Sequence, residues 1–375
     1  MNLTIDARLI NSSGIGVYLQ NVLKSERLKK YNLKLLYKDE ELSFFKNIAA
    51  YAEMIPYNAP LYSIKELLQT PAKTRNSDIF WSPHFNVPIV NFAKKLKVVT
   101  IHDVFHLAHY NTLSTGQKLY AKYMYQKAVQ SSDIIFTVSE TSKIEIIKYT
   151  GAAANKIKVV YNGIDFQQFN TLLGQEAKQN VLNNYNINFP FVLFVGNVKP
   201  HKNLRNALLG FKDYLLNEKT TETKFVIVGR RDGFITGDPE ISTMVQDPIL
   251  KDKVHFTGWV QHEDLPALYQ QAKAFVFPSF YEGFGFPPLE AMAAGCPVIS
   301  SNTSCMPEIY GDAALYFNPT NTNEIAEVLH RILNDVEVRA NLIEKGLQQS
   351  KKYNWQDSVN KKMNWIEAHN SISKY

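Results

Sequence analysis

Short apolar runs alternate with longer segments of helical periodicity along the whole chain. The runs are rich in Val, Ile and Phe, as in "KVVTIHD" and "FVLFVGN". They lack the in-and-out alternation of a half-exposed strand, so both faces of each strand are expected to be buried, as in a parallel sheet. The pattern therefore predicts an α/β fold. The helices predicted between the runs span residues 15–30, 114–130, 203–217, 262–273, 287–295, 322–334 and 336–350.

The apolar runs fall into two series, one in each half of the chain. The polar segment 170–188 lies between the two series and is predicted to be a linker with a short helix. A chain of 375 residues is also too long for one ordinary hydrophobic core. We therefore expect two Rossmann-like domains, residues 1–170 and 185–350, with their parallel sheets facing a central cleft.

The composition is that of a folded globular protein. Hydrophobic residues make up 45% of the chain and charged residues 20%, which argues against disorder. The start, "MNLTIDARLI", is not a basic leader followed by an apolar run, and no stretch approaches the roughly 20 apolar residues of a membrane span. The two cysteines, Cys296 and Cys305, have no metal-type spacing. A cytoplasmic protein with reduced thiols is the expectation.

Positive charge is concentrated in the first half of the chain. Residues 1–170 contain 21 Lys and Arg against 13 Asp and Glu, while the remainder contains 20 against 22. The first half is therefore suited to an anionic partner. Segment 113–130 interleaves lysines with tyrosines. It would form either a helix that rests on an anionic lipid surface or one whose tyrosines pack on the sheet beneath solvated lysines. The residues concerned are Lys118, Tyr120, Lys122, Tyr123, Tyr125 and Lys127.

Polar residues with candidate chemistry follow the ends of several apolar runs. In open α/β sheets, ligands bind outside the carboxyl ends of the strands. Gly14 and Gly16 in "NSSGIGVY" begin a helix, where backbone amides bind phosphate well, although a plain tight turn explains them equally. Lys202 in "GNVKPHKN" precedes a helix and is either a phosphate ligand or a solvated lysine. His102 in "TIHDVFH" is followed by Asp103, and such a pair is structural as often as catalytic.

Two carboxylates flank an otherwise apolar, glycine-rich stretch, "YEGFGFPPLEAMAAGCPVIS". Glu282 and Glu290 need polar partners if they are buried, because an unpaired buried carboxylate is costly. Gly283 and Gly285 allow backbone amides to face a ligand, and the prolines that follow suit the start of a helix. Glu290 is then expected in the first helical turn. Since such carboxylates can accept hydrogen bonds from vicinal hydroxyls, we expect both acids to find their partners in sugar hydroxyls.

Several of these motifs together resemble the family 4 retaining glycosyltransferases. The segment "EGFGFPPLEAMAAGCPVISSNTSCMPEI" is similar to the signature of that family. The segments "VGNVKPHKN", "YNGID" and "SSGIG" resemble its other ligand loops, in the expected order. The resemblance covers the whole chain and implies the GT-B fold. It also implies that "YNWQDSVNKKMNW" belongs to a C-terminal helix, within 355–375, that returns to the first domain.

The resemblance implies a role for each residue of the motifs. Glu290 is expected to hold the ribose of a nucleotide sugar, and Glu282, with the amides after it, the donor hexose. Lys202 is expected to bind the diphosphate, and the glycines of "SSGIG" to cover it. His102 is expected beside the anomeric carbon and the acceptor hydroxyl. The catalytic set so implied is His102, Lys202 and Glu282. The donor-binding set is Gly14, Gly16, Asn197, Lys202, Arg230, Gly283, Phe284, Gly285, Phe286 and Glu290.

The implied activity is a retaining transfer of a hexose from a nucleotide sugar to a glycan or lipid-linked acceptor in polysaccharide biosynthesis. The resemblance implies no cofactor, no metal and no nucleic-acid partner, and the chain contains no Asp-x-Asp sequence. The "P-x-K-N" variant looks most like the mannosyltransferase branch, so GDP-mannose is the expected donor. Asn197 stands where many members have arginine, and the missing positive charge would have to come from Arg8, Lys199 or Arg230.

Two other functions share these sequence features. A sugar-nucleotide epimerase or phosphorylase with the GT-B fold would use water or phosphate in place of a sugar acceptor. A non-catalytic sugar-nucleotide-binding protein would bind the donor without transferring it. Turnover of a nucleotide sugar without an acceptor would favour the first alternative, and binding without turnover would favour the second.

Overall fold

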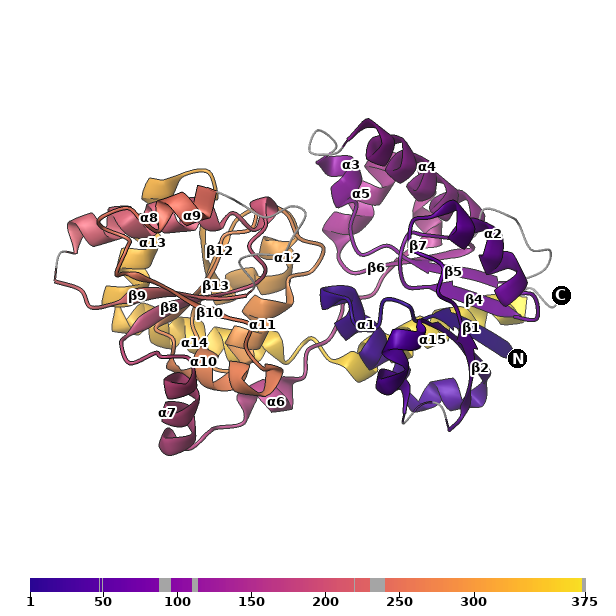
Figure 1. The fold of residues 1–375 in the computed structure, drawn as a ribbon, viewed down its shortest axis with the longest axis horizontal. Helices are drawn as coiled ribbons and strands as arrows, with labels where there is room; N and C mark the ends of the chain where they lie inside the picture. The colour runs from indigo at the N-terminus through magenta and orange to yellow at the C-terminus, as the bar shows by residue number, and fades with distance from the viewer. Residues whose placement is uncertain are drawn as a thin grey trace. The chain divides into compact units, whose positions relative to one another are not determined.

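The computed structural model describes residues 1–46, 48, 50–87, 96–109, 114–218, 220–229 and 240–372. The chain divides into two compact units (Figure 1). Unit 1 comprises Met1–Gly163 and Trp355–Tyr375, and unit 2 comprises Ile164–Asn354. The segment 170–188, expected to be a linker, lies within unit 2. Its helix α7 (Gln175–Asn184) contacts α10 (Leu265–Gln271).

Unit 1 is built on a seven-stranded parallel sheet. The strand order is β3-β2-β1-β4-β5-β6-β7, and Ile5 of β1 pairs with Leu35 on one side and Trp81 on the other. The strands are β1 (Asn2–Asp6), β2 (Asn32–Tyr37), β3 (Ala52–Pro56), β4 (Ile79–Ser82), β5 (Leu96–Thr100), β6 (Ile134–Thr137) and β7 (Ile157–Val159). The helices are α1 (Ser13–Leu23), α2 (Ile64–Lys73), α3 (Phe105–Ala108), α4 (Thr115–Ser131), α5 (Glu140–Thr150) and α15 (Trp355–Ile372).

Two hydrophobic cores lie on the two faces of this sheet. Helices α1 and α15 contribute to one core, and α4 and α5 contribute to the other (Figure 1). In α15 the buried residues Val359, Met363 and Ile366 are spaced four and three apart, so they form one apolar stripe along the helix. The last helix of the chain is therefore part of the core of unit 1.

Unit 2 is built on a six-stranded parallel sheet in the order β10-β9-β8-β11-β12-β13. Helices α8 and α13 cover one face, and α10 and α11 lie on the other (Figure 1). The strands are β8 (Phe191–Val195), β9 (Lys224–Val228), β10 (Val254–Gly258), β11 (Ala274–Phe277), β12 (Val298–Ser301) and β13 (Ala314–Phe317). The other helices are α6 (Phe166–Asn170), α8 (Leu204–Asn217), α9 (Glu240–Met244), α11 (Phe286–Ala293), α12 (Met306–Tyr310), α13 (Thr322–Asn334) and α14 (Val336–Ser350).

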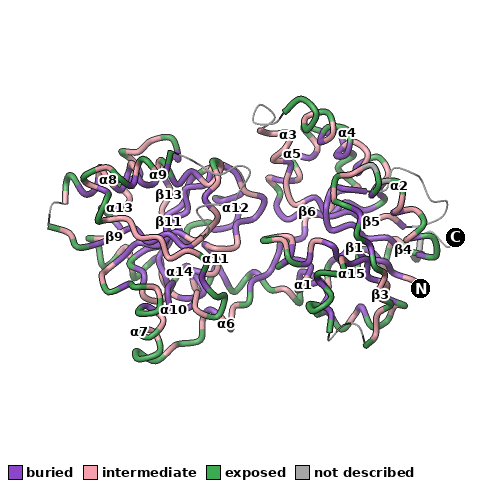
Figure 2. Tube along the Cα trace, viewed as in Figure 1, coloured by how far each residue is buried: buried purple, intermediate pink, exposed green. Residues whose placement is uncertain are grey.

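The burial pattern agrees with the doubly wound arrangement. Figure 2 shows the inner strands of both sheets as buried and the outer turns of the helices as exposed, while the edge strands β3 and β10 are only partly buried. Strands β6 and β11 are buried at every position, as expected for parallel strands covered on both faces. The predicted α/β class with two parallel sheets is confirmed.

Some predicted elements differ from those observed. The helices predicted at 322–334 and 336–350 are confirmed with those bounds. The helix predicted at 15–30 ends at Leu23 and is followed by a separate 3₁₀ turn, because Ser25 has extended backbone geometry. Strands β2, β3 and β13 were not predicted. The pattern of β3 is weak because it is an edge strand with half-exposed positions and a terminal proline.

Candidate functional site

Each sheet has a point where the strand order reverses direction, between β1 and β4 in unit 1 and between β8 and β11 in unit 2. Open α/β sheets bind ligands outside the carboxyl ends of the strands at such a point. Lys202 follows β8 and Glu282 follows β11. The structure brings them together, with 2.5 Å between Lys202 Nζ and Glu282 Oε1. Their side chains remain 20% and 14% exposed, so a ligand can reach this ion pair.

The loop that carries Lys202 is held by Asn203. This residue is buried and has a φ of 55°, a left-handed geometry that asparagine tolerates better than most residues. Its Nδ2 donates hydrogen bonds to Pro278 O at 3.0 Å and Pro319 O at 2.8 Å. Since Pro278 directly follows β11, Asn203 ties the loop after β8 to the loop that leads to Glu282.

The backbone at Glu282 is fixed by a residue of the next strand connection. The Ser304 hydroxyl donates to the Glu282 carbonyl at 2.7 Å and accepts from its N–H at 3.3 Å. Farther along, Gly285 has a φ of 79° and a Cβ there would lie 2.1 Å from the Tyr310 hydroxyl. Both the dihedral angle and the close approach therefore require glycine at position 285.

Helix α11 begins at Phe286, directly after these turns. Pro287 and Pro288 have no N–H, so the amide donors at this helix start belong to the segment that ends at Phe286. Within that segment Gly283 and Phe284 are buried, and the Phe284 ring makes an edge contact with Phe286 at 5.3 Å. Glu290 lies one turn farther along, so its predicted place in the first turn is wrong. The prediction began the helix at the prolines and missed the residue before them.

Glu290 is half-buried and has a partner within the protein. The Tyr269 hydroxyl of α10 donates to Glu290 Oε2 at 3.0 Å. Burial raises the pKa of Glu290 to about 7, and the hydrogen bond from Tyr269 opposes this change. The protein itself supplies one partner for each acid, Lys202 for Glu282 and Tyr269 for Glu290. Among the described residues, however, Glu282 Oε2 and Glu290 Oε1 have no hydrogen-bond partner, which leaves each acid one oxygen for a ligand.

In unit 1, His102 follows β5 at the carboxyl edge of the sheet. Its Nε2 lies 3.0 Å from Pro83 O. Because a carbonyl only accepts, Nε2 carries the proton and Nδ1 is left as an acceptor. The Tyr18 ring makes an edge contact with the imidazole, with 4.8 Å between centroids. Burial lowers the pKa of His102 to about 4, so the imidazole is neutral near pH 7. Asp103 accepts a hydrogen bond from the Phe105 N–H at 2.9 Å.

The two glycines of the first loop have different environments. Gly14 is exposed in the first turn of α1, whereas Gly16 is buried. A Cβ on Gly16 would lie 2.6 Å from Ile10 O. Glycine at position 16 is thus required by the close approach of α1 to the preceding turn, and only Gly14 is displayed on the surface.

The charges proposed to compensate for Asn197 are placed very differently. Arg8 is 1% exposed and forms ion pairs at 2.6 Å with both Asp6 and Glu66. Its charge is therefore already balanced inside unit 1, and it does not supply the missing cation. Asn197 and Lys199 are half-buried in the loop after β8. Arg230 lies outside the described residues.

Comparisons with known proteins agree on one family. Residues 177–349 match the family described as glycosyl transferases group 1, and residues 40–168 match glycosyltransferase family 4. The chain belongs to the family 4, group 1 glycosyltransferases. The predicted family is confirmed, and unit 2, with its Lys202–Glu282 pair, holds the group 1 segment.

Relatives of this glycosyltransferase include two bacterial mannosyltransferases. The O-antigen chain mannosyltransferase B of Escherichia coli is 29% identical over 289 residues, which cover 76% of this chain and 73% of that protein. The O-antigen chain mannosyltransferase RfbU of Salmonella typhimurium is 31% identical over 262 residues, covering 69% and 66%. A structure of HepE of Anabaena in complex with UDP-glucose has a TM-score of 0.77 at 16% identity, covering 98% of this chain and 100% of that one. The GT-B fold is confirmed.

Three residues that support the site of the glycosyltransferase were not found from the sequence. They are Asn203, Tyr269 and Ser304, which hold Lys202, Glu290 and Glu282 in place. Ser304 carried a usable signal, since it follows the apolar run "PVISS" at the same edge of the sheet as Glu282. Tyr269 carried none, because a tyrosine in a helical pattern is ordinarily a core residue.

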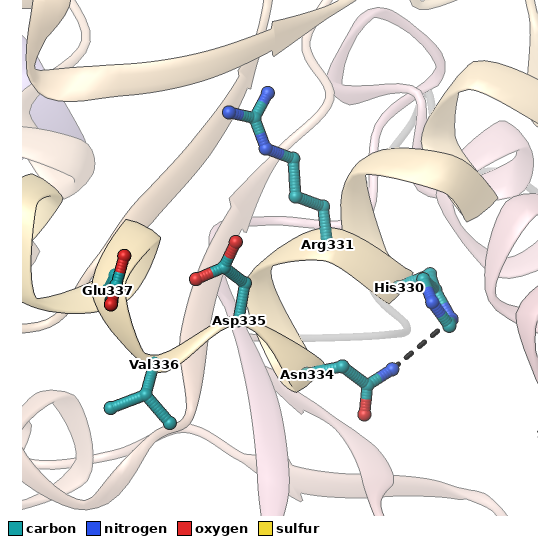
Figure 3. Close-up of a pocket in the computed structure, with 6 residues that line it drawn as sticks. All are labelled: His330, Arg331, Asn334, Asp335, Val336 and Glu337. Carbon is teal, nitrogen blue, oxygen red and sulfur yellow. Dashed lines mark hydrogen bonds between the residues drawn. The ribbon is translucent and has the colours of Figure 1, made fainter.

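The glycosyltransferase also has a surface hollow where α13 leads into α14 (Figure 3). In it the Asn334 side-chain amide lies 3.1 Å from His330 Nδ1. Because α13 runs back from the carboxyl ends of the strands, its last residues lie at the other edge of the sheet, away from the candidate site. The residues lining the hollow are His330, Arg331, Asn334, Asp335, Val336 and Glu337.

Proposed function

We propose that this glycosyltransferase transfers mannose from GDP-mannose to a glycan or lipid-linked acceptor, with retention of configuration and without a metal ion. The two mannosyltransferase relatives support mannose as the transferred sugar. The structure with UDP-glucose shows that a related fold accepts a nucleotide sugar. Within the described residues, no three His, Cys, Asp or Glu side chains gather as a metal site.

The observation that carries the proposal is the Lys202–Glu282 ion pair at the reversal point of the second sheet. A donor diphosphate would replace the Glu282 carboxylate as the partner of Lys202, because it is the stronger anion. Glu282 would then turn to a hydroxyl of the donor hexose. Glu290 would accept from the ribose, and the amides from Gly283 to Phe286 would face the sugar.

Three further residues complete the proposed donor set. Asn197 lies in the same loop as Lys202, and we place it beside the phosphates. We keep Arg230 as a second source of positive charge there. Gly14 is proposed to contribute its backbone amide, whereas Gly16 is proposed to act by allowing α1 to begin where it does.

Unit 1 would bind the acceptor, and His102 would lie beside the acceptor hydroxyl that reacts. The neutral imidazole presents Nδ1 as an acceptor for a sugar hydroxyl. Retention requires no enzyme nucleophile in this proposal. The leaving diphosphate, stabilised electrostatically by Lys202, takes the proton of the acceptor hydroxyl on the face from which it departs.

Helix α4 supplies a candidate contact with an anionic membrane. Leu119 and Tyr123 are 65% and 50% exposed, one turn apart, and Lys118 and Lys122 flank them. We call these four residues the α4 surface. The other tyrosines face inward, since Tyr125 is buried in the core and Tyr120 donates a hydrogen bond to Asn86. None of the described helices has the length and apolar character needed to cross a bilayer.

Lys202→Ala tests the proposal most directly. Its affinity for GDP, measured by calorimetry, should fall by roughly ten- to a hundredfold, corresponding to about 1.5–3 kcal/mol. Affinity for guanosine should change little, because the lysine acts on the diphosphate. The matched control is Lys251→Ala, an exposed lysine of the same unit. Equal losses for GDP and guanosine would identify a structural lysine and contradict the assignment.

Donor and metal requirement are tested on the unmodified protein. In a thermal-shift panel of nucleotide sugars, GDP-mannose at 100 times its dissociation constant should stabilise the fold by about 2.7 kcal/mol. Transfer should persist in excess EDTA. Loss of transfer in chelator that manganese or magnesium restores would contradict the metal-independent mechanism.

A further inference from the structure

Lys362 of α15 is a buried lysine in unit 1. The residue is 0% exposed. Its Nζ donates to the Ser358 hydroxyl at 2.7 Å and lies 5.0 Å from the centroid of the Tyr18 ring. Ser358 in turn donates its only proton to Tyr161 O at 2.6 Å. Among the described residues, no carboxylate forms an ion pair with Lys362.

A buried lysine without a counter-charge lowers the stability of the fold. An ammonium group without a counter-charge is costly to remove from water, and one hydroxyl and one ring face compensate for only part of that cost. A methionine would fill the same volume between Val359 and Ile366 without a charge. The position of the charge therefore indicates a role beyond packing.

The Tyr18 side chain links Lys362 to His102. Its ring contacts both the ammonium group and the imidazole. The ring is held because the Tyr18 and Trp81 side chains both contact the Thr100 hydroxyl, each at 3.0 Å. Lys362 and His102 therefore share one well-held neighbour, the Tyr18 ring.

Lys362 is the charged group that acts on His102. Burial is the main reason that the pKa of the imidazole is lowered; the hydrogen bond to Pro83 O raises it, and the nearby charge of Lys362 lowers it further. The neighbouring titratable groups do not compete: His84 is kept neutral by burial, which lowers its pKa to about 3, and Asp103 caps the Phe105 amide. Burial lowers the pKa of Lys362 itself to about 7. The ammonium is thus charged throughout the acidic range in which His102 would gain a proton.

We propose that Lys362 is a positioning residue for His102: its charge and its contact with the Tyr18 ring, which packs against the imidazole, keep Nδ1 of His102 available as an acceptor. The inference rests on the proposed role of His102 at the reacting sugar. It assigns to the C-terminal helix a function in transfer in addition to its place in the core.

The first test is the titration of His102 by NMR in protein with labelled histidine. The resonance is assigned by its absence in His102→Gln. In Lys362→Met the pKa of His102 should rise, because a nearby positive charge is removed. Lys362→Gln, which can still donate to Ser358, should show the same rise if the methionine variant folds poorly. The control is Lys361→Met, an adjacent exposed lysine with the same change of charge, and it should titrate as wild type.

The second test is the pH dependence of kcat for mannose transfer. The acidic limb in Lys362→Met should move to higher pH by the shift seen in the NMR titration, and that of Lys361→Met should not move. An unchanged His102 pKa in both Lys362 variants would overturn the proposal. So would a shifted pKa with an unmoved acidic limb. If the His102 pKa is shifted in the Lys362 variants but the wild-type protein transfers no sugar, the proposed function is contradicted and the link between Lys362 and His102 stands.

Discussion

The two units have sheets of the same winding, but the charged side chains at the carboxyl edge are accessible to solvent in unit 2 and buried or neutralised in unit 1. In unit 2, Lys202 and Glu282 form an ion pair that solvent reaches. In unit 1, Lys362 is fully buried, Arg8 is neutralised by Asp6 and Glu66, and His102 is a neutral imidazole. One edge therefore offers charges that can exchange partners, and the other offers uncharged acceptors.

This difference fits the two halves of a glycosyl transfer. A nucleotide sugar brings a diphosphate, which an edge with a solvent-accessible lysine–glutamate pair would bind by replacing one anion with another. The group that receives the sugar is a hydroxyl, which needs a neutral hydrogen-bond acceptor near it. Under the proposed function, the same backbone arrangement would serve two chemistries because the side chains at the strand ends differ.

The largest expected effect is on stability in unit 1. The pKa of Lys362 is lowered from 10.5 to about 7 on folding, so between these pH values the unfolded chain binds more protons and stability rises with pH. Below pH 7 the folded protein carries the buried charge and its full cost in free energy of unfolding. Lys362→Met should therefore stabilise the protein at pH 7 by at most about 5 kcal/mol, with a smaller gain at pH 9.

Urea unfolding at several pH values measures this gain. Lys361→Met should lie within about 0.5 kcal/mol of wild type at each pH. A gain for Lys362→Met that does not decrease between pH 7 and pH 9 would show that improved packing, not the removed charge, is responsible.

The next effect is on catalysis in unit 2. Glu282→Gln removes the carboxylate that we place on the reacting hexose, and kcat should fall by roughly 10²–10³. The KM for the donor should change much less, because Lys202 and Glu290 remain. Initial-rate measurements of GDP release give both kcat and KM. Glu263→Gln, an exposed residue of the same unit, is the control. A rise in KM at constant kcat would contradict the assignment of Glu282 to the reacting sugar.

The Glu290→Gln variant should bind the donor nucleotide more weakly and should gain stability in a pH-dependent way. The pKa of Glu290 is raised from 4.5 to about 7, so the folded chain binds more protons in that range and stability falls as pH rises through it. Glu290→Gln should stabilise the protein above pH 7 by no more than about 3 kcal/mol and should have no such effect below pH 4.5.

The same variant should bind GDP roughly tenfold more weakly, since a hydrogen bond to a charged group is replaced by a neutral one. Unfolding at pH 4.5 and 8 and calorimetry with GDP measure the two effects. Wild-type affinity for GDP in Glu290→Gln would show that the ribose is held elsewhere.

The smallest effect concerns the α4 surface. Lys118→Ala and Lys122→Ala should each weaken cosedimentation with anionic liposomes by about 1 kcal/mol, or roughly fivefold. Tyr123→Glu should weaken it further, whereas Leu68→Glu, at a 69% exposed leucine of α2, should not. Binding should decrease in high salt. Equal and negligible binding of the wild type to anionic and neutral liposomes would favour a soluble acceptor.

The sequence was most informative where a residue's role depends on local pattern. Continuous apolar runs predict parallel strands, and a polar residue after a run predicts its place at the carboxyl edge, as with Lys202 and Glu282. Edge strand β3 escaped prediction because its burial is partial and its sequence mixed. The start of α11 was misplaced by one residue because the prolines, and not Phe286, were taken as its beginning.

Contacts between distant segments could not be predicted in the same way. Tyr269 meets Glu290, and Asn203 ties together two loops that are 75 residues apart. The burial of Lys362 depends on α15 packing against α1, more than 300 positions earlier in the chain. A lysine in a helical pattern is normally exposed, and no local feature of "NKKMNW" separates Lys361 from Lys362.

The two ends of unit 2 lie beside each other, since Ile164 pairs with Asn354 and its N–H donates to Tyr353 O at 3.0 Å. Unit 2 is therefore an insertion into unit 1, whose core needs Val359, Met363 and Ile366 from the final helix. Residues 1–163 are therefore synthesised before the helix that completes their core, whereas unit 2 is one continuous segment of the chain. A chain truncated after residue 354 would contain all of unit 2 and a unit 1 without its last helix.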